Sequence, residues 1–135
     1  MKSHIPEPPQ TYTYELPGGW IVQAGKTDSD NDRLSIKFAH PRDWWFHVRS
    51  MPGSHVLLRA RQDGEEPGAG IIKAAAAIAA WHSKARSAGV VPVACTRACY
   101  VTKQRGARPG TVNIRKEQIL KVRPAIPDSS PEASG

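Results

Sequence analysis

The chain is short of cysteine, of long apolar runs and of acidic residues, and each shortage excludes a class of protein. Its two cysteines, Cys95 and Cys99, lack the paired Cys and His spacing of a structural zinc site. Their apolar, strand-like surroundings predict buried free thiols in a reducing compartment. The longest apolar run, residues 74–81, is far shorter than the roughly 20 residues of a membrane-spanning helix. Residues 1–10 contain no apolar signal-peptide core. We therefore expect a cytoplasmic protein with no membrane segment, no metal and no cofactor.

The acidic residues are outnumbered, and the excess of basic residues is concentrated in one part of the chain. There are 12 Asp and Glu against 19 Lys and Arg, which gives a formal net charge of +7. Between Lys84 and Arg123 there are ten basic residues and one acidic residue, Glu117. Such clustering favours a polyanionic partner, and nucleic acid is the commonest. The alternative is a basic protein that is merely soluble, which would not need the clustering.

The length of 135 residues fits one domain with a sizeable hydrophobic core. Residues 1–10 and 124–135 are rich in Pro or Ser and almost without apolar side chains. They bury too little surface to offset the entropy of ordering, so both are predicted to be flexible tails. The folded body is expected to run from residue 11 to residue 123, without internal repeats.

Apolar periodicity predicts an α+β domain, in which a largely antiparallel or mixed sheet is packed by one long Ala-rich helix and a short helix. The short helix is expected at residues 31–38, after a cap within residues 27–30. The long helix is expected at residues 71–87, closed by Gly89, and its alanines would let it lie close to the sheet. Strands are expected at residues 11–16, 20–25, 44–49, 55–60, 111–115 and 119–122, and the β-rich stretch 90–103 is expected to bend near Thr96.

The segment from Asp43 to Arg49 alternates between the two faces of a strand. The core-facing side chains are expected to be Trp44, Phe46 and Val48. The opposite face carries an acid, an indole, an imidazole and a guanidinium, namely Asp43, Trp45, His47 and Arg49. A stacking ring, a donor–acceptor ring and a phosphate-binding fork are what single-stranded RNA recognition uses. This face is therefore predicted to contact RNA. The alternative leaves Trp45 and His47 half-buried under a loop, with Asp43 capping the strand.

His47 and His55 lie on either side of residues 51–54, which predict a tight turn. Two strands joined by that turn would make the histidines cross-strand neighbours. Such a pair, with Asp43 orienting one imidazole, suits a phosphoester hydrolase, a nuclease or a metal site. No third ligand and no catalytic motif accompanies the pair. Ser54 would also point to the opposite face of the sheet from His55, so catalysis is the weaker interpretation.

Two further groups of basic residues are candidates for phosphate binding. The loop of residues 103–110 contains two glycines, which let backbone N–H groups approach phosphate, and three cations, Lys103, Arg105 and Arg108. It lacks the spacing of a nucleotide-binding P-loop, and a loop kept polar for solubility explains it equally well. Lys84 and Arg86 form a basic last turn of the long helix, which the helix dipole favours without any ligand.

The motifs, taken in order, resemble a known family. The chain is similar to the NFACT RNA-binding domain (NFACT-R), the C-terminal module of ribosome quality-control factors of the fibronectin-binding protein A-like type, in the pattern Asp43-x-Trp45-x-His47 followed by Pro52-Gly53-Ser54-His55-Val56. Further matches are Gly25-Lys26, Asn31-Asp32-x-Leu34, Ala76-x-x-Ala79-Ala80-Trp81-His82-Ser83-Lys84-Ala85-Arg86, Val91-Pro92-Val93, Val101-x-Lys103 and Gly106-x-x-Pro109-Gly110-x-Val112. The resemblance covers residues 19–122, nearly the whole predicted body.

The resemblance implies a non-catalytic, ribosome-associated module that recognises tRNA or ribosomal RNA. Trp45 would stack on a base, His47 and His55 would hydrogen-bond bases or sugars, and Asp43 would orient a ring or accept from a base amine. Phosphates would be met by Arg49, Lys84, Arg86, Lys103, Arg105 and Arg108. The matched positions Lys26, Asn31, Asp32, Gly53 and Ser54 would belong to the same RNA site.

The other parts of the full-length factors, an N-terminal domain, a helix-hairpin-helix and a coiled coil, do not fit in 135 residues. A stand-alone NFACT-R protein is therefore expected. Besides the hydrolase or nuclease interpretation, a protein–protein adaptor on the ribosome remains an alternative.

Overall fold

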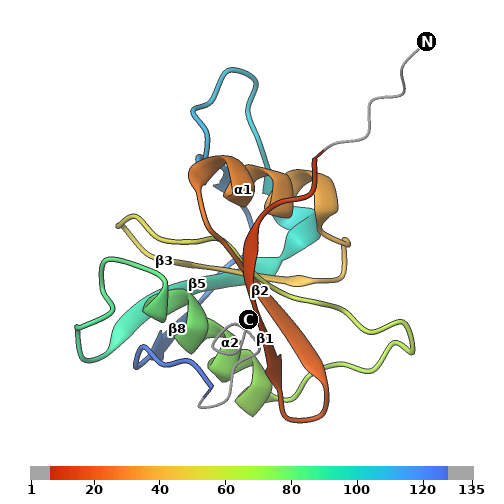
Figure 1. Ribbon diagram of the computed structural model, residues 1–135, viewed down its shortest axis with the longest axis vertical. Coiled ribbons are helices and arrows are strands. Elements are labelled where there is room, and N and C mark those ends of the chain that lie inside the picture. The colour runs from red at the N-terminus through yellow and green to blue at the C-terminus, as the bar shows by residue number, and fades with distance from the viewer. Residues whose placement is uncertain (1–6, 128–135) are drawn as a thin grey trace.

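A computed structural model describes residues 7–127 and shows an antiparallel sheet with helices on both faces (Figure 1). Within these residues the main sheet has six strands in the order β1-β2-β4-β3-β5-β8, and every neighbouring pair is antiparallel. The strands are β1 (Thr11–Leu16), β2 (Trp20–Gly25), β3 (Trp44–Val48), β4 (Val56–Leu58), β5 (Val91–Arg97) and β8 (Gln118–Val122). A second, two-stranded sheet pairs β6 (Val101–Thr102) with β7 (Asn113–Ile114). The predicted α+β class is confirmed.

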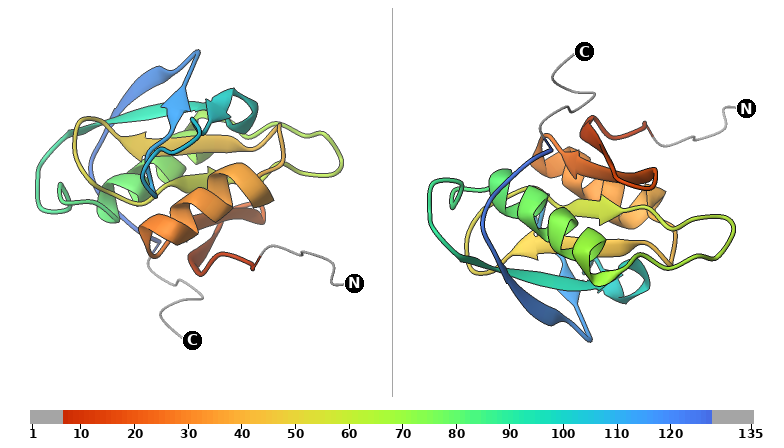
Figure 2. Two further views of the ribbon diagram at one scale, coloured as in Figure 1. Left: turned by 90° about the horizontal axis from the view of Figure 1, so that it is seen from above. Right: turned by 90° about the horizontal axis from the view of Figure 1, so that it is seen from below.

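The helices lie on opposite faces of the main sheet (Figure 2). One face is covered by α2 (Ala69–Trp81). The other is covered by α1 (Asp28–Asp32), which continues directly into the π-helix η1 (Arg33–Phe38). A single 3-10 turn, η2 (Ala98–Tyr100), joins β5 to β6. Two separate hydrophobic cores result, one on each face of the sheet.

The larger core lies between α2 and the sheet. Ala75, Ala76, Ala79 and Ala80 of α2 are fully buried, and a helix surface made of alanine can approach a sheet more closely than one made of larger side chains. These alanines therefore form part of the surface that α2 packs against the sheet. Sheet residues from every strand, including Phe46 and Val48, complete this core.

The smaller core lies on the other face and contains Leu34, Trp45, Leu57, Ala98 and Val101. The alternation predicted for β3 is confirmed, because Trp44, Phe46 and Val48 contact the α2 side while Trp45 points to this second core. Each face of β3 is nevertheless covered: Trp45 is 2% exposed. The expectation of an open Trp45 face is therefore wrong, because η1 and the segment around η2 pack over it.

The ends of both helices differ from the sequence-based expectation. The first helix begins at Asp28 instead of residue 31, because Thr27 and Asp30 form a reciprocal capping box. The long helix ends at Trp81 instead of residue 87. Residues 82–88 form turns, so Gly89 does not cap the helix and the basic residues there do not belong to its last turn.

The early end of α2 has a tertiary cause in the segment after β3. Ser54 N–H donates to His82 O at 2.8 Å, Lys84 N–H donates to Pro52 O at 3.3 Å, and Gly53 bridges to Ser83. Residues 52–54 thus pair with the chain that leaves α2, and the predicted tight turn at 51–54 is wrong. The strand β4 spans Val56–Leu58 and is shorter than the predicted strand at residues 55–60.

The packed body extends beyond the predicted boundaries at both ends. Gln10 N–H donates to Asp30 Oδ1 at 3.0 Å, and Ala125 N–H donates to Ala77 O at 3.2 Å. Ile126 packs against the larger core. The rest of the predicted tails, residues 1–6 and 128–135, lies outside the described residues. In the part of the chain that is described, no helix has the length and apolar character to span a membrane.

The two cysteines have different environments. Cys95, on β5, is buried, and burial raises the pKa of its thiol to about 12. Cys99 is exposed, so the expectation of two buried thiols is wrong for Cys99. The cause is the turn η2, which ends the strand alternation before Cys99 is reached.

Candidate nucleic-acid interface

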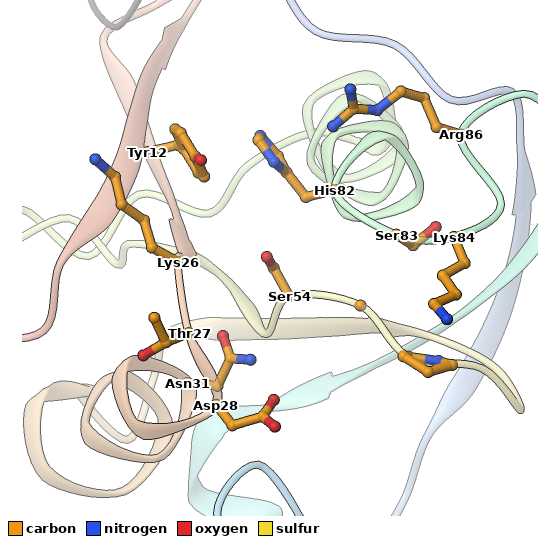
Figure 3. Close-up of a pocket in the computed structure, with 12 residues that line it drawn as sticks. Tyr12, Lys26, Thr27, Asp28, Asn31, Ser54, His82, Ser83, Lys84 and Arg86 are labelled. Atoms are coloured by element: carbon orange, nitrogen blue, oxygen red, sulfur yellow. The ribbon is translucent and has the colours of Figure 1, made fainter.

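A polar cleft of about 360 Å³, which we call the first cleft, opens between the end of α2, the N-terminus of α1 and the β1–β2 strands (Figure 3). The loop of residues 52–54 forms its floor. Its walls are built by Tyr12, Lys26, Thr27, Asp28, Asn31, His82, Ser83, Lys84 and Arg86. These residues come together because residues 52–54 draw the chain after α2 toward the N-terminus of α1.

One wall of the first cleft is an aromatic pair. The rings of Tyr12 and His82 stack with centroids 4.6 Å apart and an interplanar angle of 17°, and both rings face the cleft in Figure 3. The Lys26 Nζ lies 4.8 Å from the Tyr12 ring centroid. His82 Nε2 is 2.5 Å from the buried hydroxyl of Tyr14. The imidazole is thus held by contacts from β1, although it belongs to the residue after α2.

A second cleft, of about 460 Å³, lies on the other side of residues 52–53. It is lined by His47 of β3 and by the far end of the basic loop, Arg108, Pro109, Gly110 and Thr111. Asp28, Pro52 and Gly53 line both clefts. The two clefts therefore adjoin across the Pro52–Gly53 segment, which forms a ridge between them.

Positive charge dominates the lining of the two clefts. Lys26, Lys84, Arg86 and Arg108 are all exposed, and of the lining residues named above Asp28 alone is acidic. Arg86 is partly engaged, because its Nε donates to Trp81 O at 2.7 Å while its side chain stays exposed. Exposed cations around a concave polar surface provide an electrostatic site for phosphates.

His47 and His55 are neighbours across β3 and the start of β4, as predicted. Their ring centroids are 5.4 Å apart in an edge-to-face arrangement. His47 is half-buried at the second cleft, and burial lowers its pKa, against the opposing effect of a hydrogen bond to the Gly53 backbone. His55 is 2% exposed. Burial, and to a smaller extent the nearby His47, lower the His55 pKa to about 4.

Both ring nitrogens of His55 are engaged. Nε2 lies 3.1 Å from Gly110 O, and Nδ1 lies 2.8 Å from Ser35 Oγ. Because a carbonyl oxygen can only accept, Nε2 carries the ring proton and Nδ1 accepts from the Ser35 hydroxyl. The Trp45 Nε1–H in turn donates to Ser35 Oγ at 2.9 Å. A directed chain of hydrogen bonds thus runs from Trp45 through Ser35 and His55 to Gly110.

Asp43 and Trp45 do not reach either cleft. Asp43 is fully buried; its carboxylate accepts from the backbone N–H groups of His40 and Ala60 at 2.8 and 2.6 Å and pairs with Arg59 Nε at 3.1 Å. It therefore closes the start of β3 and orients neither imidazole. Trp45 is sealed in the second core, so its predicted stacking on a base is not supported. The alternative, with Trp45 and His47 half-buried and Asp43 capping the strand, is closer to the structure: Asp43 caps the strand and His47 is half-buried, but Trp45 is fully buried.

The remaining predicted residues divide into three groups. Asn31, Gly53 and Ser54 line the first cleft, and Asn31 Oδ1 also accepts from His55 N–H at 3.0 Å. Asp32 and Lys103 are ion-paired at 3.1 Å and hold the basic loop. The exposed residues Arg49 and Arg105 line neither cleft.

Sequence reasoning missed Tyr12, Asp28, His82 and Ser83 as lining residues. His82 and Ser83 stand inside a motif that carries the family resemblance, which was a usable signal. Tyr12 gave no such signal. Its partner His82 lies 70 positions later in the chain, and the pattern of an alternating strand does not indicate a partner so distant in sequence.

A small α+β domain whose cations converge on adjoining polar clefts has the features of a polyanion-binding module. Comparison with known proteins makes the assignment specific. The NFACT protein RNA binding domain model matches residues 10–116. The chain is therefore a member of the NFACT RNA-binding domain family.

Individual relatives agree with this assignment. The chain is 37% identical over 124 residues to the Rqc2 homolog RqcH of Bacillus subtilis, and 35% identical over 123 residues to the protein of the same name from Streptococcus suis. These matches cover 92% and 91% of this chain but 21% and 22% of the relatives, so the chain spans about a fifth of their length. The C-terminal part of the fibronectin/fibrinogen-binding protein from Streptococcus suis has a similar structure, with a TM-score of 0.78 and 34% identity over 93% of this chain and 49% of that one.

Proposed function

We propose that this domain binds RNA without catalysis, by placing the phosphate backbone of a tRNA or ribosomal RNA across the two adjoining clefts. The observation that carries the proposal is the convergence of Lys26, Lys84 and Arg86 on the first cleft, from the end of β2 and from the turns after α2. Family membership supports RNA as the polyanion. By similarity to the RqcH relatives, we further propose a role in ribosome quality control.

The geometry supports binding better than hydrolysis. The hydrolytic alternative needs Asp43 to orient one imidazole and the other imidazole to be free for proton transfer. Asp43 is instead occupied by backbone N–H groups and Arg59, and both nitrogens of His55 are hydrogen-bonded. A nuclease assay tests this: labelled tRNA should stay intact with and without Mg²⁺, and cleavage that disappears in His47→Ala would overturn the non-catalytic proposal.

Charge-matched variants test the RNA site. Lys26→Ala/Lys84→Ala/Arg86→Ala removes three cations from the first cleft. Lys37→Ala/Lys73→Ala/Lys121→Ala removes three exposed cations that line neither cleft. Fluorescence anisotropy with labelled tRNA and a ribosomal RNA fragment gives the affinity at several salt concentrations. The plot of log K against log salt has a negative slope, and each lost phosphate contact reduces its magnitude by about 0.7–0.9. The slope of the cleft variant should therefore be shallower than that of wild type by about two to three.

The control variant separates a site from general charge. We expect the cleft variant to bind about tenfold or more weakly at physiological salt, with the control within about twofold of wild type. Equal losses in the two variants would refute a localised site.

The adaptor alternative has its own test. Ribosome co-sedimentation should be abolished when the RNA is digested and should depend on the first-cleft cations. Co-sedimentation with residual ribosomal proteins that survives nuclease treatment would favour a protein-docking function instead.

A further inference from the structure

The basic loop between β6 and β7 is held at Gly110 by both of its backbone groups. The Gly110 N–H donates to Asp32 Oδ1 at 2.9 Å, and its carbonyl accepts from His55 Nε2 at 3.1 Å. Gly110 has φ of +85°, and a Cβ there would lie 2.9 Å from Asp28 Oδ1. Glycine is therefore required both by its backbone conformation and by the close approach of α1.

Lys103 makes a second attachment of the same loop. Its Nζ pairs with Asp32 Oδ2 at 3.1 Å and donates to the backbone carbonyls of Arg108 at 2.5 Å and Thr111 at 3.0 Å. The Lys103 side chain is 22% exposed. This ammonium group thus has three partners within the protein, and it fixes the backbone of Arg108, whose own side chain is exposed at the second cleft.

The attachment is anchored deep in the domain. His55 is fixed by the hydrogen bond to Ser35, and Ser35 by the bond from Trp45 in the second core. Since the His55 pKa is about 4, its ring stays neutral near pH 7 and the donor direction toward Gly110 is kept. Trp45 and His55, two residues of the sequence motif, thus connect the second core through Ser35 to the loop that carries Arg108.

We propose that His55, Asp32 and Lys103 are positioning residues, which hold the loop of residues 103–111 so that Arg108 faces the second cleft, and that they act on RNA through Arg108 and not by contact. The inference rests on the proposed RNA-binding function. Arg105 provides an internal comparison. It lies in the same loop, three residues before Arg108, and is exposed, but it lines neither cleft.

A double-mutant cycle on RNA affinity tests the coupling. Asp32→Asn/Lys103→Met removes the ion pair without altering the net charge. If the pair acts through Arg108, adding Arg108→Ala to this variant should weaken binding by less than about twofold, although Arg108→Ala alone in the wild-type background should weaken it about fivefold or more. Adding Arg105→Ala should change the affinity by the same factor in both backgrounds. Fully additive losses with Arg108→Ala would overturn the proposal, because they would mean that Lys103 contacts RNA itself.

Two His55 variants separate its two hydrogen bonds. Gln at position 55 can still donate to Gly110 O from the place of Nε2, whereas Asn matches Nδ1 and cannot reach the loop. We expect His55→Gln to retain the affinity lost in His55→Asn. Equal affinities of the two folded variants would overturn the role given to His55. If His55→Asn fails to fold, Asp32→Asn/Lys103→Met carries the test, since both of these side chains are partly exposed whereas His55 is buried.

A measurement without RNA separates this inference from the proposed function. Amide hydrogen exchange at Gly110 and Thr111 reports whether the loop is held. Exchange should accelerate about tenfold or more in Asp32→Asn/Lys103→Met and stay near wild type in Arg108→Ala. Unchanged exchange in the ion-pair variant would refute the positioning role even if RNA binding stands. If exchange accelerates in the ion-pair variant but the wild-type protein binds no RNA, the proposed function is refuted. Only the structural attachment of the loop would then stand.

Discussion

Replacing His55 with Gln should flatten the pH dependence of folding stability. In the folded protein the His55 pKa is lowered to about 4 from the ordinary value of 6.5, because the ring is buried and because His47 lies beside it. The unfolded chain therefore binds the proton more tightly. The stability contributed by the neutral buried ring is fully present above about pH 6.5 and is lost as the pH falls toward 4. A difference of about 2.5 units at 1.36 kcal/mol each corresponds to about 3 kcal/mol, of which about 2 kcal/mol should be lost by pH 5.

Urea denaturation followed by circular dichroism at pH 7, 6 and 5 measures this loss. Carboxylates with lowered pKa, such as Asp30 and Glu66, also destabilise the wild-type protein in acid. The informative quantity is therefore the difference between the wild-type and His55→Gln profiles, which cancels them. Wild type should lose about 2 kcal/mol more than the variant between pH 7 and 5. Parallel profiles would mean that His55 titrates normally, and the buried, directed hydrogen-bond chain would then be wrong.

Three other substitutions distinguish residues that build the domain from residues that meet RNA. Trp45→Leu should lower the unfolding free energy by about 3–4 kcal/mol, because the indole is buried in the second core; a change within about 0.5 kcal/mol, as at an exposed site, would contradict this burial. Asp43→Ala should cost about 2–4 kcal/mol in thermal or urea unfolding, because two buried N–H groups and an arginine lose their acceptor; a loss under 0.5 kcal/mol, typical of surface sites, would contradict this. Gly53→Ala places a Cβ 2.8 Å from Ser83 Cβ and should displace the ridge, lowering RNA affinity by about fivefold or more by anisotropy, whereas Gly70→Ala, with open space around it, should not.

Much of the fold follows from local patterns. The first two strands, the alternation of β3 and a helix cap within residues 27–30 were predictable because strand period and cap chemistry act over a few residues. The neighbouring histidines were predictable for a related reason, since His47 and His55 are related by the pairing of two strands close in sequence. Element boundaries were less predictable. The end of α2 depends on hydrogen bonds from residues 52–54, about thirty positions earlier in the chain, which no helix propensity reveals.

The candidate site was predictable in composition more than in geometry. The excess of basic residues after Lys84 pointed to a polyanion, but it did not distinguish a cation that faces a cleft from one used inside the protein. Lys103 and Arg108 show the difference: they belong to one loop, yet Lys103 is bound to Asp32 and backbone carbonyls while Arg108 is exposed. Sequence-local reasoning assigned both to phosphate because charge and spacing are all it can read.

The amino-acid sequence by itself determined the class of domain, its family and the two faces of β3, because periodicity, charge and motif order are properties of the chain. Only the tertiary structure decided what covers each face. Alternation tells that Trp45 and Phe46 point in opposite directions, but whether a face meets solvent depends on segments that fold back from elsewhere, here η1 and the residues around η2. The same long-range packing sealed Trp45, fixed His55 against Gly110, and brought Tyr12 and Lys26 opposite Lys84 at the first cleft.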